Sequence, residues 1–459
     1  MDRLSNVGRS LPDSRALLGG GIAEGQRQAI LETLDAGLAA VEPGRALSLH
    51  LDVDGGRARA GNRAYSPRNV WVVGAGKASG VMAAAAEKIL GDRVAGGLVI
   101  VKDGHRAPTS RVELVEAAHP VPDARAIEAT LRLVELGRHA RADDLILCLL
   151  SGGGSALLTW PAEGLSLADL QATTDLLLRC GATIHELNTV RKHLDRVKGG
   201  GLARLVGSAP ILTLALSDVV GDDLAVIASG PTTPDPTTVA DACRVLDRYE
   251  LWATVPAAVS TRLRQGAGEA LRDTLTPSDP AFDRVLNVIV GNNAQAASAA
   301  ASRGRELGLH ATVLTTTQQG EARNLGSRLA RLGCDLHDGR GPLPLPACLI
   351  VGGETTVTVR GPGRGGRNQE AALAAAIELA GVPGVAVACF ATDGGDGPTN
   401  AAGAMVDGTT VARARALGLD PQMHLERNDS YPFFGALGDH LLTGPTGTNV
   451  GDLYCVFAW

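Results

Sequence analysis

Short apolar runs alternate with amphipathic or alanine-rich stretches along most of this chain. In the first half the apolar runs have the length of buried strands, and the stretches between them have helical periodicity. In chain order these segments are residues 70–76, 77–90, 96–102, 129–140, 144–150, 166–181 and 209–216. Alternating strands and helices of this kind predict a doubly wound α/β sheet, whose ligands bind at the carboxyl ends of the strands.

A second strand and helix pattern begins near residue 284, after a stretch rich in Gly, Pro and Thr that we interpret as a linker region, residues 266–282. It contains an apolar run from residue 347, an alanine-rich helix over 368–380 and another apolar run from residue 384. Before the first pattern, residues 25–41 predict an amphipathic helix, and residues 46–61 predict a hairpin with Asp-Gly at its turn. We therefore expect two α/β domains.

Composition narrows the choice of partners. Hydrophobic residues make up 45% of the chain and charged residues 20%, with a formal net charge of −6. This balance disfavours a nucleic-acid partner, which clustered excess Lys and Arg would attract. No apolar run is long enough for a membrane span, and no secretory signal is visible, so the cytoplasm is the predicted compartment. The seven scattered cysteines predict neither a disulfide framework nor a zinc site.

The segment "WVVGAGKASG", residues 71–80, resembles a phosphate-binding turn but matches neither common pattern. It lacks the first glycine and the Ser or Thr of a P-loop, and Ser79 stands where a dinucleotide fingerprint has its third glycine. Gly74 and Gly76 allow a tight turn between strand and helix, so that backbone amides and Lys77 are expected to point at one anion.

"LLSGGGSALL", residues 149–158, repeats this design more strongly, because three consecutive glycines expose backbone N–H groups. The expected anion-binding residues of this loop are Ser151, Gly152, Gly153, Gly154 and Ser155. The next polar segment, "NTVRKHLDRVKGGGLA", places cations at helical spacing, and we expect Asn188, Arg191 and Lys192 to bind substrate or nucleotide. A solvated helix face with Asp195 paired to Arg191 is the alternative interpretation.

Acidic and arginine-bearing loops follow other predicted strands. Asp218 ends a buried strand in "LALSD", a position that suits a general base or a Mg²⁺ ligand. In "GGETTVTVRGPGRGGRNQE" the arginines Arg364 and Arg367 precede a helix and are suited to clamping a phosphoryl group. "ATDGGDGPTN" carries Asp393 and Asp396 as a metal or hydroxyl site, with an Asx-type turn as the alternative.

Together with "HPVPD", residues 119–123, these segments make the chain similar to the class II glycerate kinases, the glycerate 2-kinase family with a C-terminal MOFRL domain. The resemblance covers nearly the whole chain. It implies a Rossmann-like N-terminal domain, residues 1–275, a smaller α/β MOFRL domain, residues 284–459, and an active site in the cleft between them.

The resemblance further implies transfer of a phosphoryl group from ATP to the 2-hydroxyl of D-glycerate, with Mg²⁺ as cofactor and 2-phosphoglycerate as product. Lys77, Asp218 and Arg367 would be catalytic, and Asp218, Asp393 and Asp396 would hold the metal. The expected substrate and nucleotide contacts are Gly74, Gly76, Ser79, Ser151, Gly152, Gly153, Gly154, Ser155, Asn188, Arg191, Lys192, Glu354, Arg364 and Asn368. Which loop holds ATP phosphates and which holds glycerate stays open, as does a homodimer.

Two rival functions remain. A hydroxypyruvate reductase using NADH or NADPH would need a dinucleotide site, and Asp103 lies near the place of a ribose-binding acid, although its distance in sequence from Gly74 is long. A sensor of nucleotides or sugar phosphates would need the anion loops but no base or metal-binding acid. The irregular glycine fingerprint disfavours the reductase, and the acids Asp218, Asp393 and Asp396 disfavour the sensor.

Overall fold

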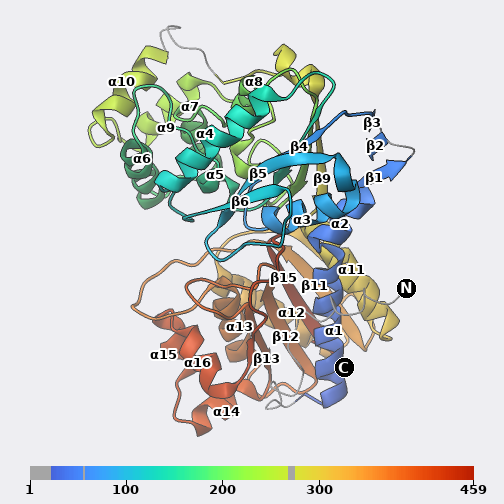
Figure 1. Cartoon of the computed structure of the whole chain (residues 1–459). Helices are drawn as coiled ribbons and strands as arrows, with labels where there is room; N and C mark the ends of the chain where they lie inside the picture. Colours follow the sequence, from blue (N-terminus) through green and yellow to red (C-terminus); the bar gives the residue numbers. More distant parts are fainter. Residues whose placement is uncertain (1–21, 55–56, 62, 267–273) are drawn as a thin grey trace. The chain divides into compact units, whose positions relative to one another are not determined.

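The computed structural model describes residues 22–54, 57–61, 63–266 and 274–459, which form two compact units. Unit 2 is Pro43–Val290, and unit 1 consists of Gly291–Trp459 together with the described part of Met1–Glu42. Both are α/β (Figure 1). No helix in these ranges has the length and apolar content that a membrane crossing requires. Part of the predicted linker, residues 267–273, lies outside the described residues.

Unit 2 is built on a six-stranded sheet in the order β6-β5-β4-β7-β8-β9. The pairs β5/β6, β4/β5, β4/β7 and β7/β8 are all parallel. Numbered along the sheet, this order is 3-2-1-4-5-6, the arrangement of dinucleotide-binding folds, which confirms the doubly wound prediction. The strands are β4 (Val70–Ala75), β5 (Val94–Lys102), β6 (Val112–Ala117), β7 (Leu145–Leu150), β8 (Ile211–Leu216) and β9 (Val285–Gly291).

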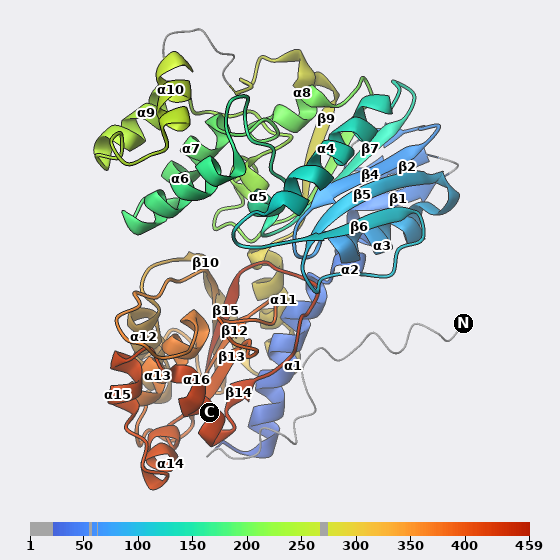
Figure 2. The ribbon, with the colours of Figure 1, turned by 60° about the vertical axis from the view of Figure 1, so that its left-hand side comes forward.

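Helices cover both faces of this sheet (Figure 2). Ile100 packs in one core cluster with α4 (Ala124–His139), whereas a side chain added at Gly80 of α3 (Ser79–Leu90) would meet Val101. Neighbouring residues of a strand point to opposite faces, so α3 and α4 lie on opposite sides. The central strands β7 and β8 are buried at every position, as expected for parallel strands covered on both faces.

A second core of unit 2 is helical. It joins α6 (Leu167–Arg179), α7 (Ile184–His193), α9 (Val239–Arg248) and α10 (Ala257–Gly266) through leucine and valine side chains. Ser166, Thr183 and Thr238 cap the first three of these helices with hydroxyl groups, and an acid three residues later completes a capping box in each. The remaining short helices of unit 2 are α5 (Gly154–Leu157), α8 (Gly201–Leu205) and the 3-10 turns Gly91–Arg93, Ile227–Ser229 and Pro280–Arg284.

The region before β4 differs in part from its prediction. The hairpin is present as β1 (Leu51–Asp54) and β2 (Arg57–Ala60), and β3 (Arg63–Tyr65) extends it. Residues 46–50, predicted as its first strand, instead belong to α2 (Pro43–His50). Ala46 and Leu47 are buried one turn inside a helix that starts with proline, a favoured residue at that position, and α2 packs against α3.

Unit 1 has a mixed six-stranded sheet in the order β10-β11-β15-β12-β13-β14. Only β10 and β11 pair in parallel, and β15 runs antiparallel between β11 and β12. The strands are β10 (His310–Gln318), β11 (Ala347–Gly353), β12 (Val385–Ala391), β13 (Gly403–Asp407), β14 (His440–Leu441) and β15 (Asp452–Ala458). This agrees with the predicted second α/β domain.

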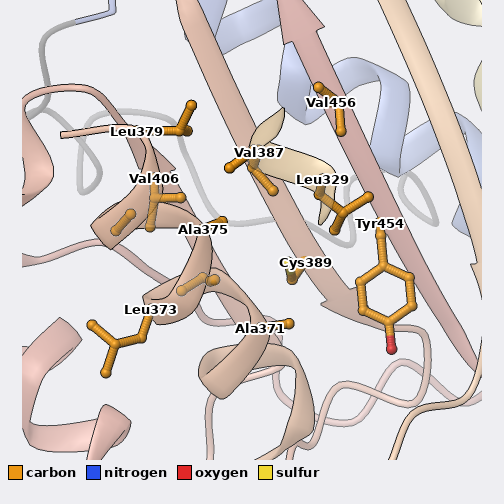
Figure 3. Packing of buried hydrophobic residues seen from close by; sticks show 14 of the residues in the cluster. Leu329, Ala371, Leu373, Ala375, Leu379, Val387, Cys389, Val406, Tyr454 and Val456 are labelled. Carbon is orange, nitrogen blue, oxygen red and sulfur yellow. The ribbon is translucent and has the colours of Figure 1, made fainter. Parts of the chain in front are cut away.

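The faces of this sheet carry different helices. α12 (Ala322–His337) and α13 (Arg367–Glu378) form one core with alternate residues of β11, β12 and β15, including Tyr454 and Val456, as Figure 3 shows. On the other face lie α11 (Asn293–Glu306) and α1 (Glu24–Ala40), where a side chain at Gly37 would press on Leu453 and on Ala300 of α11. The peripheral helices are α14 (Thr410–Ala416), α15 (Pro421–Glu426) and α16 (Ser430–Leu437).

The limits of the two units differ from the predicted domains 1–275 and 284–459 at both ends. α1 belongs with the second half of the chain, because its apolar residues pack on α11 and Glu32 forms an ion pair with Arg303. β9, predicted to open the second domain, is the edge strand of the unit 2 sheet. Both differences arise from contacts between segments far apart in sequence, Glu32 with Arg303 and β9 with β8, which local pattern does not report.

Candidate active site

Two predicted anion loops meet at the centre of the unit 2 sheet. They follow β4 and β7, the adjacent strands at which the strand order reverses, and ligands of doubly wound sheets bind at this point. The N–H of Lys77 donates to the carbonyl of Gly152 at 2.9 Å, and the N–H of Ala78 donates to Ser151 Oγ at 3.0 Å. The structure thus brings together the two segments that the sequence singled out separately.

Glycine is required where these loops touch. A Cβ at Gly76 would overlap Ser151 Oγ, and the φ of Gly76 is 148°, a backbone conformation that other residues rarely adopt. Ser79, at the place of a third fingerprint glycine, has its hydroxyl 3.0 Å from Ser151 Oγ and is fully buried. Ser79 and Ser151 therefore join the loops to each other, and the side chain that remains at the surface of this turn is Lys77, which is half-buried.

Two histidines near Lys77 were not predicted as site residues. His105 Nδ1 lies 3.1 Å from the carbonyl oxygen of Lys77. A Cβ built at Gly153 would lie 3.0 Å from the His119 ring and 3.4 Å from Lys77 Cγ, so both side chains pass over this glycine. His119 opens the segment "HPVPD", which carried the family resemblance, and that segment was the available signal.

A chain of hydroxyl groups fixes the end of the triple-glycine loop. Ser229 donates to Asn188 Oδ1 at 3.0 Å, and Ser155 Oγ lies 2.8 Å from Ser229 Oγ. A hydroxyl has one hydrogen, so Ser155 must donate to Ser229. Ala228 and Ser229 have φ values of 51° and 60°, a strained conformation for non-glycine residues that clusters at functional sites. Asn188, predicted to bind ligand, is 3% exposed and instead supports this loop.

The sequence predicted that the cations of α7 form a row on one surface of the helix, but the structure does not show such a row. Lys192 Nζ is 3.2 Å from Asp235 Oδ1, and both side chains are almost completely buried. Asp235, 43 residues away in sequence, neutralises the charge of Lys192. Ligand binding by Lys192 stays a prediction. The alternative pairing of Asp195 with Arg191 is wrong, because Asp195 holds Lys198 at 3.0 Å.

Asp218 follows β8, which pairs in parallel with β7. The carboxyl ends of parallel strands lie at one edge of a sheet, so Asp218 is at the same edge as Lys77 and the Ser151 loop. Its side chain is half-buried. Its predicted role stays a prediction.

In unit 1, Arg367 begins α13 and is held by two carboxylates. Its Nε and Nη2 donate to the two oxygens of Asp452 at 2.6 and 3.0 Å, and Nη1 lies 3.2 Å from Glu354 Oε1. Burial alone would lower the pKa of Arg367, but the carboxylates of Asp452 and Glu354 outweigh it and raise this pKa well above its ordinary value. Arg367 is a permanently charged and firmly oriented guanidinium.

The sequence analysis missed Asp452, which is fully buried. It also accepts from Tyr454 at 2.9 Å and from the amide of Asn368 at 3.0 Å. Register places Asp452 opposite both Gly353, the end of β11, and Ala391, the end of β12. The predicted loops of unit 1 therefore gather around it. An acid directly after Gly451 at the start of an apolar run was the only local signal.

Asp396, predicted as a metal ligand, caps α13. Its Oδ1 accepts from the N–H of Asn368 at 3.0 Å and its Oδ2 from the N–H and side chain of Gln369 at 2.9 and 3.0 Å. Gly366, the N-cap residue of α13, has no side chain that could accept hydrogen bonds from the first N–H groups of the helix. Asp396 accepts these hydrogen bonds from another loop. Burial raises the pKa of Asp396 to about 6, although the two amides lower it. Both oxygens of Asp396 thus support α13, and its predicted role as a metal ligand stays a prediction.

The other predicted residues of unit 1 have defined places. Asp393 Oδ1 accepts from the N–H of Gly395 at 3.1 Å, the Asx turn considered as an alternative, and the side chain is half-buried. Arg364 is exposed, with its guanidinium 4.7 Å from the Tyr431 ring and its Nε donating to the carbonyl of Pro398. Within the described ranges, no group of three or more His, Cys, Asp or Glu side chains is arranged to hold a metal ion.

Comparison with known proteins adds an independent result. The profile of DUF4147, a domain of unknown function, matches residues 29–264, and that of the MOFRL family matches residues 347–452. The glycerate 2-kinase of Pyrococcus horikoshii is 43% identical over 84% of this chain and 86% of its own. An Agrobacterium vitis protein provisionally named hydroxypyruvate reductase is 42% identical over 84% of this chain and 98% of its own. The crystal structure of glycerate kinase from Thermotoga maritima superposes with a TM-score of 0.83 at 41% identity, covering 95% of this chain and 100% of that one.

Proposed function

The chain belongs to the glycerate 2-kinase family that combines a DUF4147 and a MOFRL domain, and on that basis we propose that it transfers the terminal phosphoryl group of ATP to the 2-hydroxyl of D-glycerate. The products are 2-phosphoglycerate and ADP. The observation that carries the proposal is the pair of hydrogen-bonded loops, Gly74–Ser79 and Ser151–Ser155, at the point where the strand order of unit 2 reverses. Such a position suits an anionic substrate.

Phosphoryl transfer requires positioning and positive charge more than covalent chemistry. In the proposed mechanism Asp218 accepts the proton of the glycerate 2-hydroxyl as that oxygen attacks the γ-phosphorus. Lys77 neutralises charge on the transferred group. Arg367 donates to the same group with the N–H groups that Asp452 and Glu354 leave available, since each Nη carries two hydrogens. Participation of both units follows the predicted cleft, which stays a prediction.

Mg²⁺ belongs to the proposal as the usual partner of ATP. Magnesium in kinases is held by one or two carboxylates together with phosphate oxygens, so a dedicated cluster of protein ligands is not needed. The predicted carboxylates for this role are Asp218 and Asp393, both half-buried, and Asp396, which also accepts hydrogen bonds from α13. When bound, the ion would shield the charge of the ATP phosphates. The cytoplasm stays the predicted compartment, and oligomeric state stays open.

The reductase has one observation in its favour. Asp103 follows β5, the second strand of the 3-2-1-4-5-6 order, where dinucleotide folds place their ribose-binding acid. Both of its oxygens, however, accept from the guanidinium of Arg125 at 2.7 and 2.9 Å. A cofactor ribose would have to compete with this bidentate ion pair, so we favour the kinase.

Phosphorus NMR of the protein with Mg-ATP and D-glycerate tests the proposal. We expect a 2-phosphoglycerate signal, and no oxidation of NADH or NADPH in a parallel sample with hydroxypyruvate. A 3-phosphoglycerate signal would overturn the assigned position, and cofactor oxidation without a phosphorylated product would overturn the kinase. Binding of both substrates without turnover would favour the sensor.

The role of Asp218 is tested by Asp218→Asn, for which we expect a kcat lower by about 10²- to 10⁴-fold, the typical contribution of a positioned base. Asp222→Asn is the matched control, since Asp222 lies in the same loop with a φ of 58° that asparagine tolerates. Equal kcat values for the two variants would remove Asp218 from the mechanism.

A further inference from the structure

A small cavity lies in unit 2 between α6 and α7, next to the triple-glycine loop. Its volume is about 30 Å³, room for about two water molecules. Its other walls are apolar side chains that include Leu170, Leu177 and Val190 of these helices, and its polar walls are Ser155, Thr159, Thr173, Thr174, Arg191, Asp195 and Lys198. Such a cavity accepts a group of two or three heavy atoms.

The cavity contains two cations and one carboxylate. Asp195 Oδ2 accepts from Lys198 Nζ at 3.0 Å and from the Thr159 hydroxyl at 2.6 Å. Asp195 Oδ1 accepts from the N–H of Val197 at 2.9 Å. Lys198 is buried, and its Nζ also donates to the carbonyl of Leu158 at 2.7 Å. Asp195 and Lys198 therefore satisfy each other within a local hydrogen-bond network.

Arg191 supplies the second positive charge. Among the described residues, its one hydrogen-bond partner is the Thr174 hydroxyl, 3.4 Å from Nε. Burial lowers the pKa of Arg191 to about 10, while the charge of Asp195 opposes this shift, so the guanidinium stays protonated at neutral pH. Arg191 is half-buried, and partial burial of a cation without a carboxylate partner costs free energy that a structural role would not explain. The cavity is short of one negative charge.

We propose that this cavity binds the carboxylate of D-glycerate, with Arg191 as the charged partner, an inference that rests on the proposed function. A carboxylate has three heavy atoms and one negative charge, which match the volume and the missing charge, whereas the triphosphate of ATP exceeds both. Guanidinium groups bind carboxylates through paired N–H groups. Glycerate carries its 2-hydroxyl on the carbon bonded to the carboxylate, and Ser155 connects the cavity to the loop whose Gly152 contacts Lys77.

Steady-state kinetics of Arg191→Met test this assignment. We expect the KM for D-glycerate to rise about 10- to 100-fold, the value of a hydrogen bond to a charged group, while the KM for ATP stays unchanged. Arg179→Met is the matched control, since Arg179 lies on α6 with a side chain 77% exposed. A higher KM for ATP, or an unchanged KM for glycerate, would overturn the proposal.

Thermal unfolding separates this role from a structural one. Removing a half-buried charge that has no carboxylate partner should leave the melting temperature of Arg191→Met unchanged or raise it, whereas Lys198→Met should lower it by leaving the buried Asp195 without its cation. If Arg191→Met melts lower by as much as Lys198→Met, Arg191 is structural. Arg191→Lys keeps the charge but loses the planar donor pair, so its KM for glycerate should lie between those of wild type and Arg191→Met.

Direct binding keeps this test independent of turnover. By calorimetry without ATP, wild type should bind D-glycerate more tightly than the uncharged glyceramide, and Arg191→Met should bind both equally weakly. That result with no phosphorylated product would retain the carboxylate subsite and refute the kinase. Phosphorylation with equal affinity of wild type for glycerate and glyceramide would retain the kinase and refute the subsite.

Discussion

The strand-end loops of unit 1 and unit 2 have similar compositions, but their charged side chains differ in whether they have internal partners of opposite charge. In unit 1 the charge of Arg367 meets Asp452 and Glu354, and Asp396 meets the amides of α13. In unit 2 Lys192 and Lys198 are paired, but Arg191 has no carboxylate partner among the described residues. Glycines and charges at strand ends therefore do not identify a ligand site by themselves. The number of protein groups of opposite charge or hydrogen-bonding capacity around a charged side chain distinguishes side chains that stabilise the fold from those that can bind a ligand.

The contrast between the two units would be contradicted most strongly if the loss of Asp452 left the stability of unit 1 unchanged. Asp452→Ala leaves Arg367 without its bidentate partner and the Tyr454 hydroxyl without its acceptor. We expect the free energy of unfolding of unit 1 to fall by about 3–5 kcal/mol, the usual cost of breaking a buried ion pair. Urea denaturation followed by circular dichroism and by Trp459 fluorescence measures it. Asp338→Ala removes an exposed partner of Arg340 and should cost under about 1 kcal/mol, so equal losses would refute the contrast.

In unit 2 we expect substitution of Lys77 to lower activity rather than stability. Lys77→Met should lower kcat by about 10²- to 10³-fold, because one donor to developing charge stabilises a transition state by about 3–4 kcal/mol. The melting temperature should stay within a few degrees of wild type. Lys88→Met, an exposed lysine on the adjacent helix α3, provides the control. A large loss of stability with unchanged kcat would assign Lys77 to the fold, like the cations of unit 1.

The smallest expected effect concerns the cap of α13. Burial raises the pKa of Asp396 to about 6 in the folded protein, so this group favours folding at low pH and its contribution is lost as pH rises through that value. From pH 4 to pH 7, Asp396→Asn should gain up to about 3 kcal/mol of unfolding free energy relative to wild type. Urea melts across this range measure the difference. Asp420→Asn, at the exposed cap of α15, should show no such trend, and a shared trend would exclude Asp396 as its source.

The strands that build the fold could be predicted from sequence because each is a continuous apolar run. β7 and β8 coincide with such runs, and so do β11 and β12. The membership of β9 and α1 could not be predicted, since an apolar run does not reveal which sheet it joins. Parallel pairing explains why the Lys77 and Ser151 loops lie side by side: adjacent parallel strands bring their following loops together.

The internal partners that the sequence did not predict share a physical cause. The partner that decides a charged side chain's role lies far along the chain: Asp235 for Lys192, and Asn368 with Gln369 for Asp396. Asp452 was not predicted because it is the first residue of its strand, whereas ligands of parallel sheets are expected at the carboxyl ends of strands. In unit 1 an antiparallel strand begins at the edge where its neighbours end, so a buried acid at its start belongs to the same site.

The packing of α1 on α11 has a consequence for biosynthesis. This helix is synthesised before unit 2, yet its apolar partners, α11 and β15, follow the whole of unit 2 in sequence. At about 5–20 residues per second, translation of the intervening chain takes on the order of ten seconds or more. During that time Ile30, Leu34 and Leu38 have no native surface to cover them. Unit 2 is thus continuous in sequence and can fold during synthesis, whereas the core of unit 1 is complete only after β15 has been made.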